Sequence, residues 1–288
     1  MTDSTHEGAT TAEELAGALT LLFVPGDRPE RYAKAAASGA DVIVVDLEDA
    51  VAPEAKEEAR AAAVRWFAEG GTGIVRVNAP DTAYFVEDVA ALAPHVDVVL
   101  LPKAEDPGVV ADLVTRLRER RPGAGVFALV ETARGILAAP QVASVAGVVR
   151  MAFGNFDLST ELGLHPDDHE ALWPLRTSVV VASAAAQLPA PVDGVSGAID
   201  DVSAIEADTR HATRVGYGAK LCIHPRQVPV VASALAPAAE EVAWARRVVD
   251  AWDTATSGAV ALDGKMLDKP VVDRARRVLA AAERSHRS

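Results

Sequence analysis

Residues 42–49 read Val-Ile-Val-Val-Asp-Leu-Glu-Asp, and this stretch decides the fold prediction. Its first four residues are β-branched and apolar, and three carboxylates follow almost at once. A strand that helices cover on both faces is apolar throughout, which is typical of parallel sheets in α/β proteins. The stretch therefore predicts a buried parallel strand with carboxylates at its carboxyl end.

Seven other segments have the same character, and Ala-rich helical stretches separate them. The predicted strands are residues 20–25, 42–47, 73–78, 96–103, 125–131, 148–153, 192–196 and 219–224. The predicted helices include residues 29–38, 53–69, 107–120, 168–186 and 201–215, several with Pro or Asp in the first turn. Eight alternations predict a closed (β/α)₈ TIM barrel. An open doubly wound sheet is the alternative, although it usually has fewer strands at this length.

Three regions follow from this pattern. Residues 1–18 are acidic and rich in small residues, and we expect them to be disordered. Residues 19–236 would form the catalytic barrel, and residues 237–288 would form a C-terminal helical extension. The total of 288 residues suits a single barrel of about 250 residues with such an appendage.

Composition narrows the classes of partner. The formal net charge of -13 repels nucleic acid and anionic membranes, so neither is expected as a partner. No stretch approaches the ~20 apolar residues of a membrane span, and no basic region precedes an apolar run as in a secretory signal. The single cysteine, Cys222, excludes an internal disulfide and suits a reducing cytoplasm, the expected location. It lies in an apolar strand and is expected in the core.

Polar residues follow nearly every predicted strand at its carboxyl end, where the active sites of such barrels lie. They include Arg28, Asp46, Glu48, Asp49, Arg76, Asn78, Lys103, Glu131, Thr132, Gly154, Asn155, Asp157 and His224. Asp49, Thr132 or Asp157 could instead be helix caps. Arg76 and Lys103 are harder to explain in that way, so we expect a functional cluster.

Glu131 and Asp157 close two neighbouring strands, so their side chains can converge on one point. Two hard oxygen ligands, with positions left for water and substrate, suit Mg²⁺. His165 and His169 could also share one helix face at a metal. Pro166 and the acidic residues between the two histidines favour a solvated loop that enters a helix.

Arg76 suits a planar carboxylate, which a guanidinium can hold with two parallel hydrogen bonds. It could also form a salt bridge to Glu48 or Asp49, and such a bridge would pre-orient it. Lys103 could form a Schiff base with a substrate. The carboxylate cluster makes that unnecessary, so an ion pair across the barrel mouth is favoured.

In these residues the sequence resembles the citrate lyase β-subunit-like family, which includes malyl-CoA and citramalyl-CoA lyases and is related to the HpcH/HpaI aldolases. The resemblance extends from Leu22 to about Leu279 and rests on eight segments in the same order. They are LFVPGDRPER (22–31), DLEDAVAP (46–53) with Lys56 and Arg60, RVN (76–78), LPK (101–103), LVETARG (129–135), GNFDL (154–158), IHPRQV (223–228) and GKMLDKP (264–270).

The resemblance implies roles for these residues. Glu131 and Asp157 would ligate Mg²⁺, and Arg76 would hold a 2-oxo acid. Asp268 lies in a segment that in similar proteins forms a lid, often over a neighbouring subunit's site, where it is the acid/base on the thioester's α-carbon. Asp46, Glu48 and Asp49 would orient water and Arg76. The residues that would contact substrate, besides Arg76, are Asp49, Gly154 and Asn155.

The implied function is Mg²⁺-dependent cleavage of a short β-hydroxyacyl-CoA, of the citryl-CoA, malyl-CoA or citramalyl-CoA type, into an acyl-CoA and a 2-oxo acid. Thioester hydrolysis or a malate-synthase-like condensation are alternatives at the same site. Two further alternatives are a citrate lyase subunit that uses acyl-carrier-protein thioesters and a non-catalytic metabolite-binding protein. The resemblance also suggests a homo-oligomer, in particular a trimer.

Contacts to the CoA nucleotide are the least defined part of the site. Arg28, Arg31 and Lys34 are candidates, although a solvated helix face would have the same composition. The family often has Arg-Ser where this chain has Leu19-Thr20, and Glu where Phe156 precedes the metal-binding Asp. These departures concern contacts to substrate or coenzyme, whereas the metal site is retained.

Overall fold

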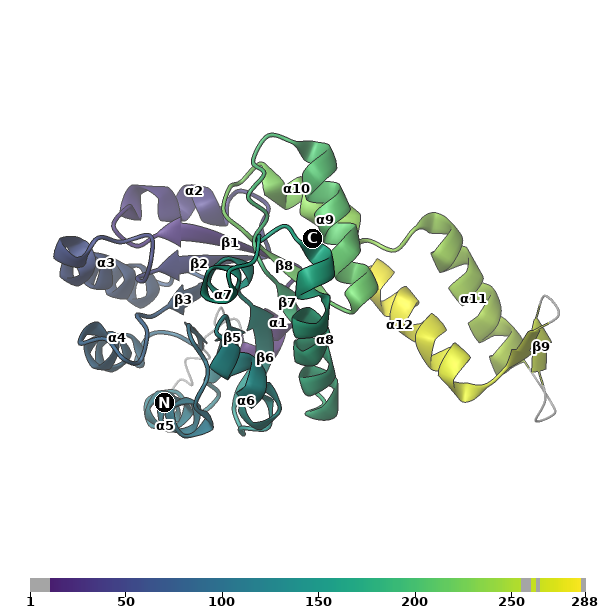
Figure 1. Ribbon diagram of the computed structural model, residues 1–288, viewed down its shortest axis with the longest axis horizontal. Helices are drawn as coiled ribbons and strands as arrows, with labels where there is room; N and C mark the ends of the chain where they lie inside the picture. The colour runs from purple at the N-terminus through teal and green to yellow at the C-terminus, as the bar shows by residue number, and fades with distance from the viewer. Residues whose placement is uncertain (1–10, 255–259, 263–264, 286–288) are drawn as a thin grey trace, which may run out of the picture. The chain divides into compact units, whose positions relative to one another are not determined.

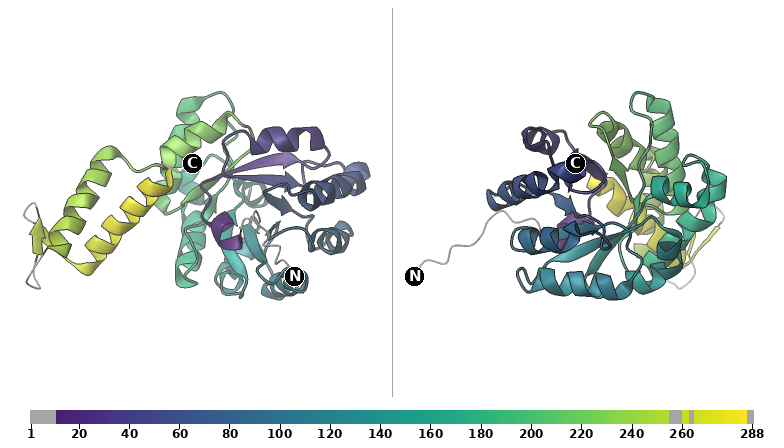
Figure 2. Two further views of the ribbon diagram at one scale, coloured as in Figure 1. Left: turned by 180° about the vertical axis from the view of Figure 1, so that it is seen from behind. Right: turned by 60° about the vertical axis from the view of Figure 1, so that its left-hand side comes forward.

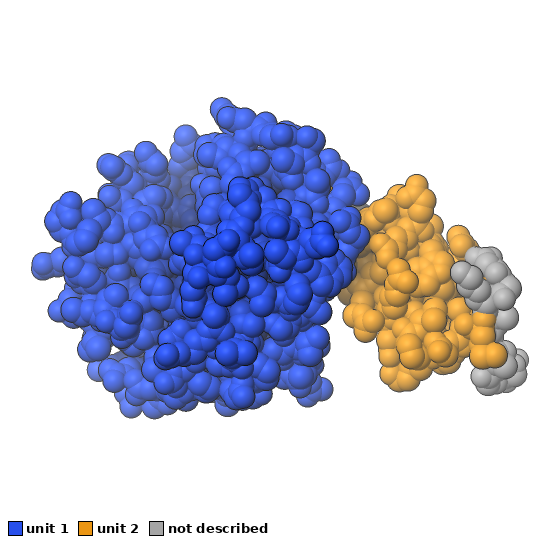
Figure 3. Space-filling model, in the orientation of Figure 1, with its two compact units in different colours: residues 1–231 blue, residues 232–288 orange. Residues whose placement is uncertain are grey.

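The computed structural model describes residues 11–254, 260–262 and 265–285. The chain divides into two compact units after Val231, and each is described by itself (Figure 3). None of the helices within the described ranges is long and apolar enough to cross a membrane.

The first unit is built on a closed barrel of eight parallel strands in sequential order (Figure 1). The strands are β1 (Thr20–Pro25), β2 (Val42–Asp46), β3 (Ile74–Arg76), β4 (Val98–Leu101), β5 (Gly125–Val130), β6 (Val148–Phe153), β7 (Val192–Asp193) and β8 (Ala219–Cys222). Each lies within a predicted strand, so the closed barrel is confirmed and the open sheet is excluded. Most strands end before the predicted position, because the polar residues there turn away into loops.

Helices surround the barrel on its outside, as Figures 1 and 2 show. They are η1 (Pro29–Arg31), α2 (Tyr32–Ala36), η2 (Pro53–Ala55), α3 (Lys56–Ala68), α4 (Tyr84–Leu92), α5 (Pro107–Arg118), α6 (Ala133–Ala143), α7 (Asn155–Leu162), α8 (His169–Ala185), α9 (Val202–Val215) and α10 (Gln227–Leu235). Thr132, Asp168 and Asp201 cap α6, α8 and α9 by accepting a main-chain N–H in the first turn. These caps fix where each helix begins after its strand or loop.

Helix α1 (Ala12–Ala16) precedes the barrel, so the prediction of disorder over residues 1–18 is wrong for residues 12–18. Residues 1–10 lie outside the described residues. A capping box joins Thr11 and Glu14 at the start of the helix. Leu15 and the neighbouring alanines share one apolar core with the side chains inside the barrel. The helix therefore closes the end of the barrel at which β1 begins.

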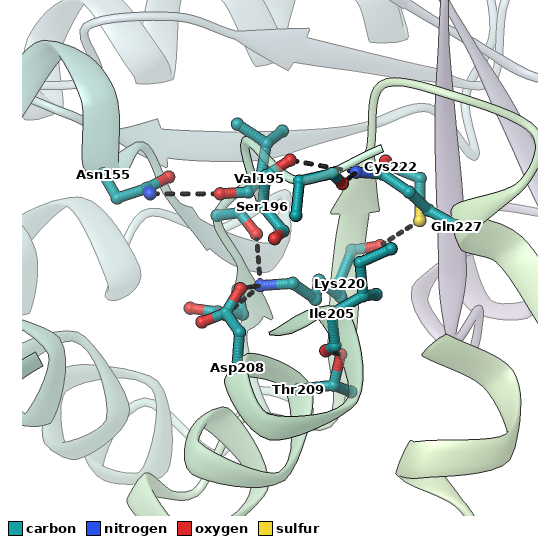
Figure 4. Close-up of polar contacts among 12 residues, drawn as sticks. Asn155, Val195, Ser196, Ile205, Asp208, Thr209, Lys220, Cys222 and Gln227 are labelled. Atoms are coloured by element: carbon teal, nitrogen blue, oxygen red, sulfur yellow. Dashed lines mark hydrogen bonds and ion pairs between the residues drawn. The ribbon is translucent and has the colours of Figure 1, made fainter. Parts of the chain in front are cut away.

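A buried ion cluster joins β7 and β8 to the helices outside them. Lys220 Nζ lies 2.7 Å from Asp193 Oδ2. It also lies 2.8 Å from Oδ2 of Asp208, which Figure 4 labels beside Lys220. Arg176 of α8 lies 2.5 Å from the other oxygen of Asp193. Burial alone would raise the pKa of Asp193, but Lys220 and Arg176 hold it below its usual value. Because removing one partner would leave a buried charge, the cluster fixes this side of the barrel wall.

The second unit contains two helices and a hairpin. Helices α11 (Ala239–Asp253) and α12 (Lys269–Ser285) pack on each other through a small core that includes Val248 and Val272. Strand β9 (Val260–Leu262) pairs antiparallel with β10 (Lys265–Leu267). The helical extension agrees with the predicted fold class, whereas the hairpin is absent from the sequence prediction.

Candidate active site

A cavity of about 380 Å³ opens at the carboxyl ends of the barrel strands. Carboxylates and a guanidinium form one part of its wall, and apolar side chains form the rest. The lining residues are Phe23, Pro25, Asp46, Asp49, Ala50, Arg76, Leu129, Glu131, Phe153, Gly154, Asn155, Phe156, Asp157, Val195, Leu221 and Ile223. The polar lining was predictable from the sequence, whereas the apolar lining was not, since those residues resemble ordinary strand core.

Asp46 and Arg76 form a paired fork in this cavity. They are partners in the β2–β3 register, and Arg76 Nε and Nη2 donate to the two carboxylate oxygens of Asp46, each at 2.7 Å. Burial alone would lower the pKa of Arg76, but Asp46 and Glu48 raise it overall. Nη1 lies 3.1 Å from Glu48 and 3.4 Å from Asp49, so the predicted salt bridges are present. Asp46, which the sequence analysis did not single out as the partner, holds Arg76 most closely.

Glu48 is buried beside this fork. Neither of its carboxylate oxygens accepts a hydrogen bond from a described residue, because the 3.1 Å contact with Arg76 lies outside hydrogen-bond geometry. Lys103 Nζ lies 3.8 Å from Glu48 Oε1, which is the ion pair predicted for Lys103. Burial raises the pKa of Glu48 to about 7, against the opposing effect of Arg76. Lys56 fixes the main chain here, since Nζ donates to the carbonyl oxygens of Leu47 and Glu48.

Glu131 follows β5 and is 3 % exposed. Burial raises its pKa to about 8, Glu48 adds to the increase and Arg76 opposes it. Its Oε1 accepts a hydrogen bond of 2.9 Å from the main-chain N–H of Lys103. A β-carbon at Gly154 would lie 2.6 Å from Oε2, so glycine is needed there to leave room for the carboxylate. A bound cation would stabilise the charged form of Glu131.

Asp157 lies in the first turn of α7 and lines the same cavity as Glu131. Burial, together with Asp49, raises its pKa. The lining holds four carboxylates and one cation, Arg76, so the cavity carries excess negative charge. Within the described ranges no three His, Cys, Asp or Glu side chains are grouped around a metal position. Two carboxylates suit Mg²⁺ nevertheless, because Mg²⁺ in proteins usually keeps several waters, and the donor set fits it.

The loop after β7 forms the neighbouring part of the wall. Asn155 Nδ2 donates to the carbonyl oxygen of Val195 at 3.1 Å (Figure 4). Gln227 Nε2 donates to the carbonyl oxygens of Ser196 and Ala198. The predicted strand extends to residue 196, but β7 ends at Asp193, and side chains hold the residues after it as a loop. Gly154, Asn155 and Asp49, all expected at the substrate, line the cavity.

Four predicted site residues lie outside the lining, and one of them, Glu48, is buried beside Arg76. Arg28 and Lys34, proposed for the CoA nucleotide, are exposed on the loop before η1 and on α2. Asp268 belongs to the second unit, where it is exposed and its Oδ1 accepts a hydrogen bond from the Val271 N–H at the start of α12. The functional roles of Arg28, Lys34 and Asp268, like those of the residues in the lining, stay predictions.

The alternative sites have simpler structural explanations. His169 stacks on His211 with ring centres 4.1 Å apart, whereas His165 is exposed and lies 3.9 Å from Asp167. The two histidines therefore contact different partners, and the favoured prediction, a loop that enters a helix at His169, is confirmed. Burial raises the pKa of Cys222 to about 12, which suits a core residue and not a nucleophile.

Comparison with known proteins identifies the family. The chain is 39 % identical over 268 residues to a citrate lyase subunit beta-like protein of Mycobacterium tuberculosis, covering 91 % of this chain and 94 % of the relative. It is 32 % identical over 275 residues to a (3S)-malyl-CoA thioesterase of Cereibacter sphaeroides, covering 92 % and 94 %.

Solved structures extend the similarity to the fold. Protein CitE from M. tuberculosis in complex with magnesium, acetoacetate and coenzyme A has a TM-score of 0.80 and 38 % identity, covering 93 % of this chain and 99 % of that one. A citrate lyase beta subunit from the same organism, complexed with oxaloacetate and magnesium, has a TM-score of 0.68 and 38 % identity, covering 77 % and 99 %. A profile of one family also matches residues 19–225. The chain therefore belongs to the HpcH/HpaI aldolase/citrate lyase family.

Proposed function

We propose that this protein is a Mg²⁺-dependent carbon–carbon lyase that cleaves a short β-hydroxyacyl-CoA into an acyl-CoA and a 2-oxo acid. The observation that carries the proposal is the cavity itself, in which Glu131 and Asp157 lie with Arg76 among excess carboxylates. A divalent cation would offset that charge and, together with Arg76, would bind the anionic head of a substrate. The similar CitE protein was crystallised with magnesium, acetoacetate and coenzyme A, which supports this substrate class.

Each polar residue has a task in this proposal. Glu131 and Asp157 would hold Mg²⁺, which when bound would polarise the oxygen that becomes the ketone of the 2-oxo acid. Arg76 would bind the carboxylate of the hydroxy-acid end. Asp46 already orients the guanidinium through two hydrogen bonds, so little reorganisation is needed when substrate arrives.

Cleavage breaks one carbon–carbon bond and transfers two protons. A carboxylate of the cluster would take the proton of the substrate's hydroxyl group as that oxygen becomes the ketone oxygen. The electrons of the breaking carbon–carbon bond then pass to the thioester as an enolate. Asp268 would return a proton to its α-carbon from the lid that the family resemblance assigns to this segment. We retain the homo-oligomeric state as part of the proposal, since such lids often serve a neighbouring subunit.

A thioesterase is the second candidate, because a relative that the chain matches over 92 % of its length is named as a (3S)-malyl-CoA thioesterase. Hydrolysis would use the same cavity, with water attacking the thioester carbonyl. Condensation in the reverse direction would also need no new residues. Two alternatives do not involve catalysis on free CoA esters. One is a citrate lyase subunit that uses acyl-carrier-protein thioesters, and the other is a protein that binds a metabolite without catalysis.

The deciding experiment offers the purified chain malyl-CoA, citramalyl-CoA and citryl-CoA with Mg²⁺, and detects 2-oxo acid and free thiol separately. Release of 2-oxo acid is expected from at least one substrate, and free thiol without 2-oxo acid would establish the thioesterase instead. Asp157→Ala should abolish turnover. Asp112→Ala, which removes an exposed carboxylate on α5, is the matched control and should not. Full Mg²⁺-dependent turnover by Asp157→Ala would show that the metal assignment is wrong.

A further inference from the structure

Lys103, two residues beyond β4, has a left-handed backbone with φ of 47°. Gln187 is the other non-glycine residue with positive φ among the described residues. A residue with a β-carbon is sterically disfavoured in this region, and such a conformation persists where its surroundings demand it, often at functional sites. The surroundings of Lys103 should therefore reveal what the conformation achieves.

Two consecutive main-chain amides attach this loop to the end of β5. The Ala104 N–H donates to the carbonyl oxygen of Leu129 at 3.0 Å, which continues the main-chain pairing of β4 and β5. The Lys103 N–H donates instead to a side chain, Glu131 Oε1, at 2.9 Å. The left-handed turn thus directs one amide away from the ladder and toward the buried carboxylate.

The side chain of Lys103 contacts a different group. Its ammonium lies 3.8 Å from Glu48 Oε1, and the side chain is 39 % exposed. Glu131, in contrast, is nearly fully buried, and its Oε2 lies against Gly154, a residue of the cavity wall. The main chain of Lys103 therefore holds one oxygen of Glu131 and leaves the oxygen beside Gly154 without a contact from this loop.

We propose that Lys103 is a positioning residue that acts through its main chain: its left-handed backbone aims the amide at Glu131 Oε1 and so orients the Glu131 carboxylate for a divalent cation. The inference rests on the proposed role of Glu131 as a metal ligand. Groups that orient a metal ligand by hydrogen bonding commonly contribute about 10-fold to 100-fold in metal affinity. The ammonium of Lys103 is not needed for this task.

The first test needs no substitution at Lys103. Residue-specific amide exchange is measured by NMR on the metal-free full chain and on Glu131→Ala. The Lys103 amide should exchange at least about tenfold faster in the variant, because an exposed or unpaired amide loses its protection. The Ala104 amide, which bonds to Leu129, is the internal control and should not change. Equal exchange of the Lys103 amide in both proteins would overturn the inference.

The second test measures Mn²⁺ affinity by electron paramagnetic resonance for four variants of the full chain. Lys103→Gly and Lys103→Met keep the amide and lose the ammonium, whereas Lys103→Pro removes the amide and forbids positive φ. We expect the first two to lose at most about threefold in affinity, and Lys103→Pro to lose about tenfold or more. Lys103→Met also keeps the β-carbon, so it separates charge from backbone freedom.

The Mn²⁺ affinities of the four variants separate the role of Lys103 from the metal site itself. If Lys103→Pro binds Mn²⁺ with wild-type affinity, the inference is overturned. It is also overturned if Lys103→Gly and Lys103→Met lose as much Mn²⁺ affinity as Lys103→Pro, because the ammonium would then be the active group. Glu131→Ala is the fourth variant and tests the proposed function separately. If Glu131→Ala binds Mn²⁺ like the wild type, the proposed metal site fails. If only Glu131→Ala loses affinity, the metal site stands and the role of Lys103 fails. If Lys103→Pro does not fold, the amide-exchange result decides.

Discussion

Asp46 and Arg76 neutralise each other on adjacent strands through two hydrogen bonds of 2.7 Å, at the wall of a cavity that otherwise carries excess negative charge. Arg76→Lys would keep the charge but lose the planar fork. We expect kcat/KM for the CoA ester to fall about 100-fold, as a misplaced binding group can cause. Steady-state kinetics measure this. Arg116→Lys, in an exposed ion pair with Asp112, is the control and should retain wild-type rates.

Gly154→Ala should disturb the carboxylate of Glu131 directly. The added β-carbon would lie 2.5 Å from Glu131 Cβ, which is far inside normal contact distance. We expect a loss of about 1–3 kcal/mol in the free energy of unfolding, as for other overpacked sites, together with weaker Mn²⁺ binding. Gly123→Ala faces open space and should change neither quantity. Unchanged stability and metal affinity in Gly154→Ala would contradict the close packing of these two residues.

Removal of metal should lower thermal stability, independently of any substrate. A ligand that binds only the folded state stabilises it by about 2.7 kcal/mol at 100 times its dissociation constant. We expect EDTA-treated wild type to gain in Tm when Mg²⁺ is restored. Asp157→Ala should show little gain, because one of the two proposed ligands is lost, whereas Asp112→Ala should respond like the wild type. An equal gain in Asp157→Ala would assign the Mg²⁺ effect to another site.

His211 should make the protein less stable in mild acid. Burial, with further contributions from His169 and Arg176, lowers its pKa from 6.5 to about 4. The charged and titratable groups near it are His169, Arg176, Asp193 and Arg214. Between these two pH values the unfolded chain binds the proton and the folded protein does not, so stability falls as pH is lowered through the window.

His211→Gln should remove part of that slope. We expect the difference between pH 6.5 and pH 4 to shrink by about 1 kcal/mol, a value reduced for solvent screening at this partly exposed ring. Urea denaturation at each pH measures it. His165→Gln changes an exposed histidine outside the stack and should leave the slope as it is. A steeper slope in His211→Gln would show that the sign is wrong.

Leu15→Ala tests whether α1 is part of the folded core. Leu15 is 4 % exposed and packs with side chains inside the barrel, so truncation leaves a cavity there. We expect a loss of about 2–5 kcal/mol in the free energy of unfolding. Glu13→Ala changes an exposed residue of the same helix and should have a small effect. If this helix were disordered, both Leu15→Ala and Glu13→Ala would leave the free energy of unfolding nearly unchanged.

The strands could be predicted because they are buried on both faces and are therefore mostly apolar. The predicted strand that contains β7 is the informative exception. Val192 and Asp193 pair with neighbouring strands, but Val195 and Ser196 bond through their carbonyl oxygens to the side chains of Asn155 and Gln227. An apolar sequence alone does not show whether its main-chain groups bond to a neighbouring strand or to side chains. Helix α1 was detectable in principle from the spacing of Thr11 and Glu14, which is a capping-box signature.

The polar site was predictable as a set of residues but not as a set of partners. Strand ends place Arg76 near Asp46, Glu48 and Asp49, yet only the β2–β3 register decides that Asp46 is the close partner. The same limit applies to Lys103, whose left-handed backbone leaves no signature in its residue type. Residue type indicates chemistry, whereas register and backbone conformation determine which atoms meet.

The packed barrel interior, which α1 covers at one end, has a consequence for the order of events at the other end. A pocket with a sealed floor has a single exit, so anything that reaches its depth must pass whatever occupies its mouth. If the 2-oxo acid forms at the inner carboxylates while a long thioester fills the opening, the two products depart in sequence. In the synthetic direction the acyl-CoA would bind last, and in the cleavage direction it would leave first. The acyl-CoA and the 2-oxo acid would then give different patterns of product inhibition.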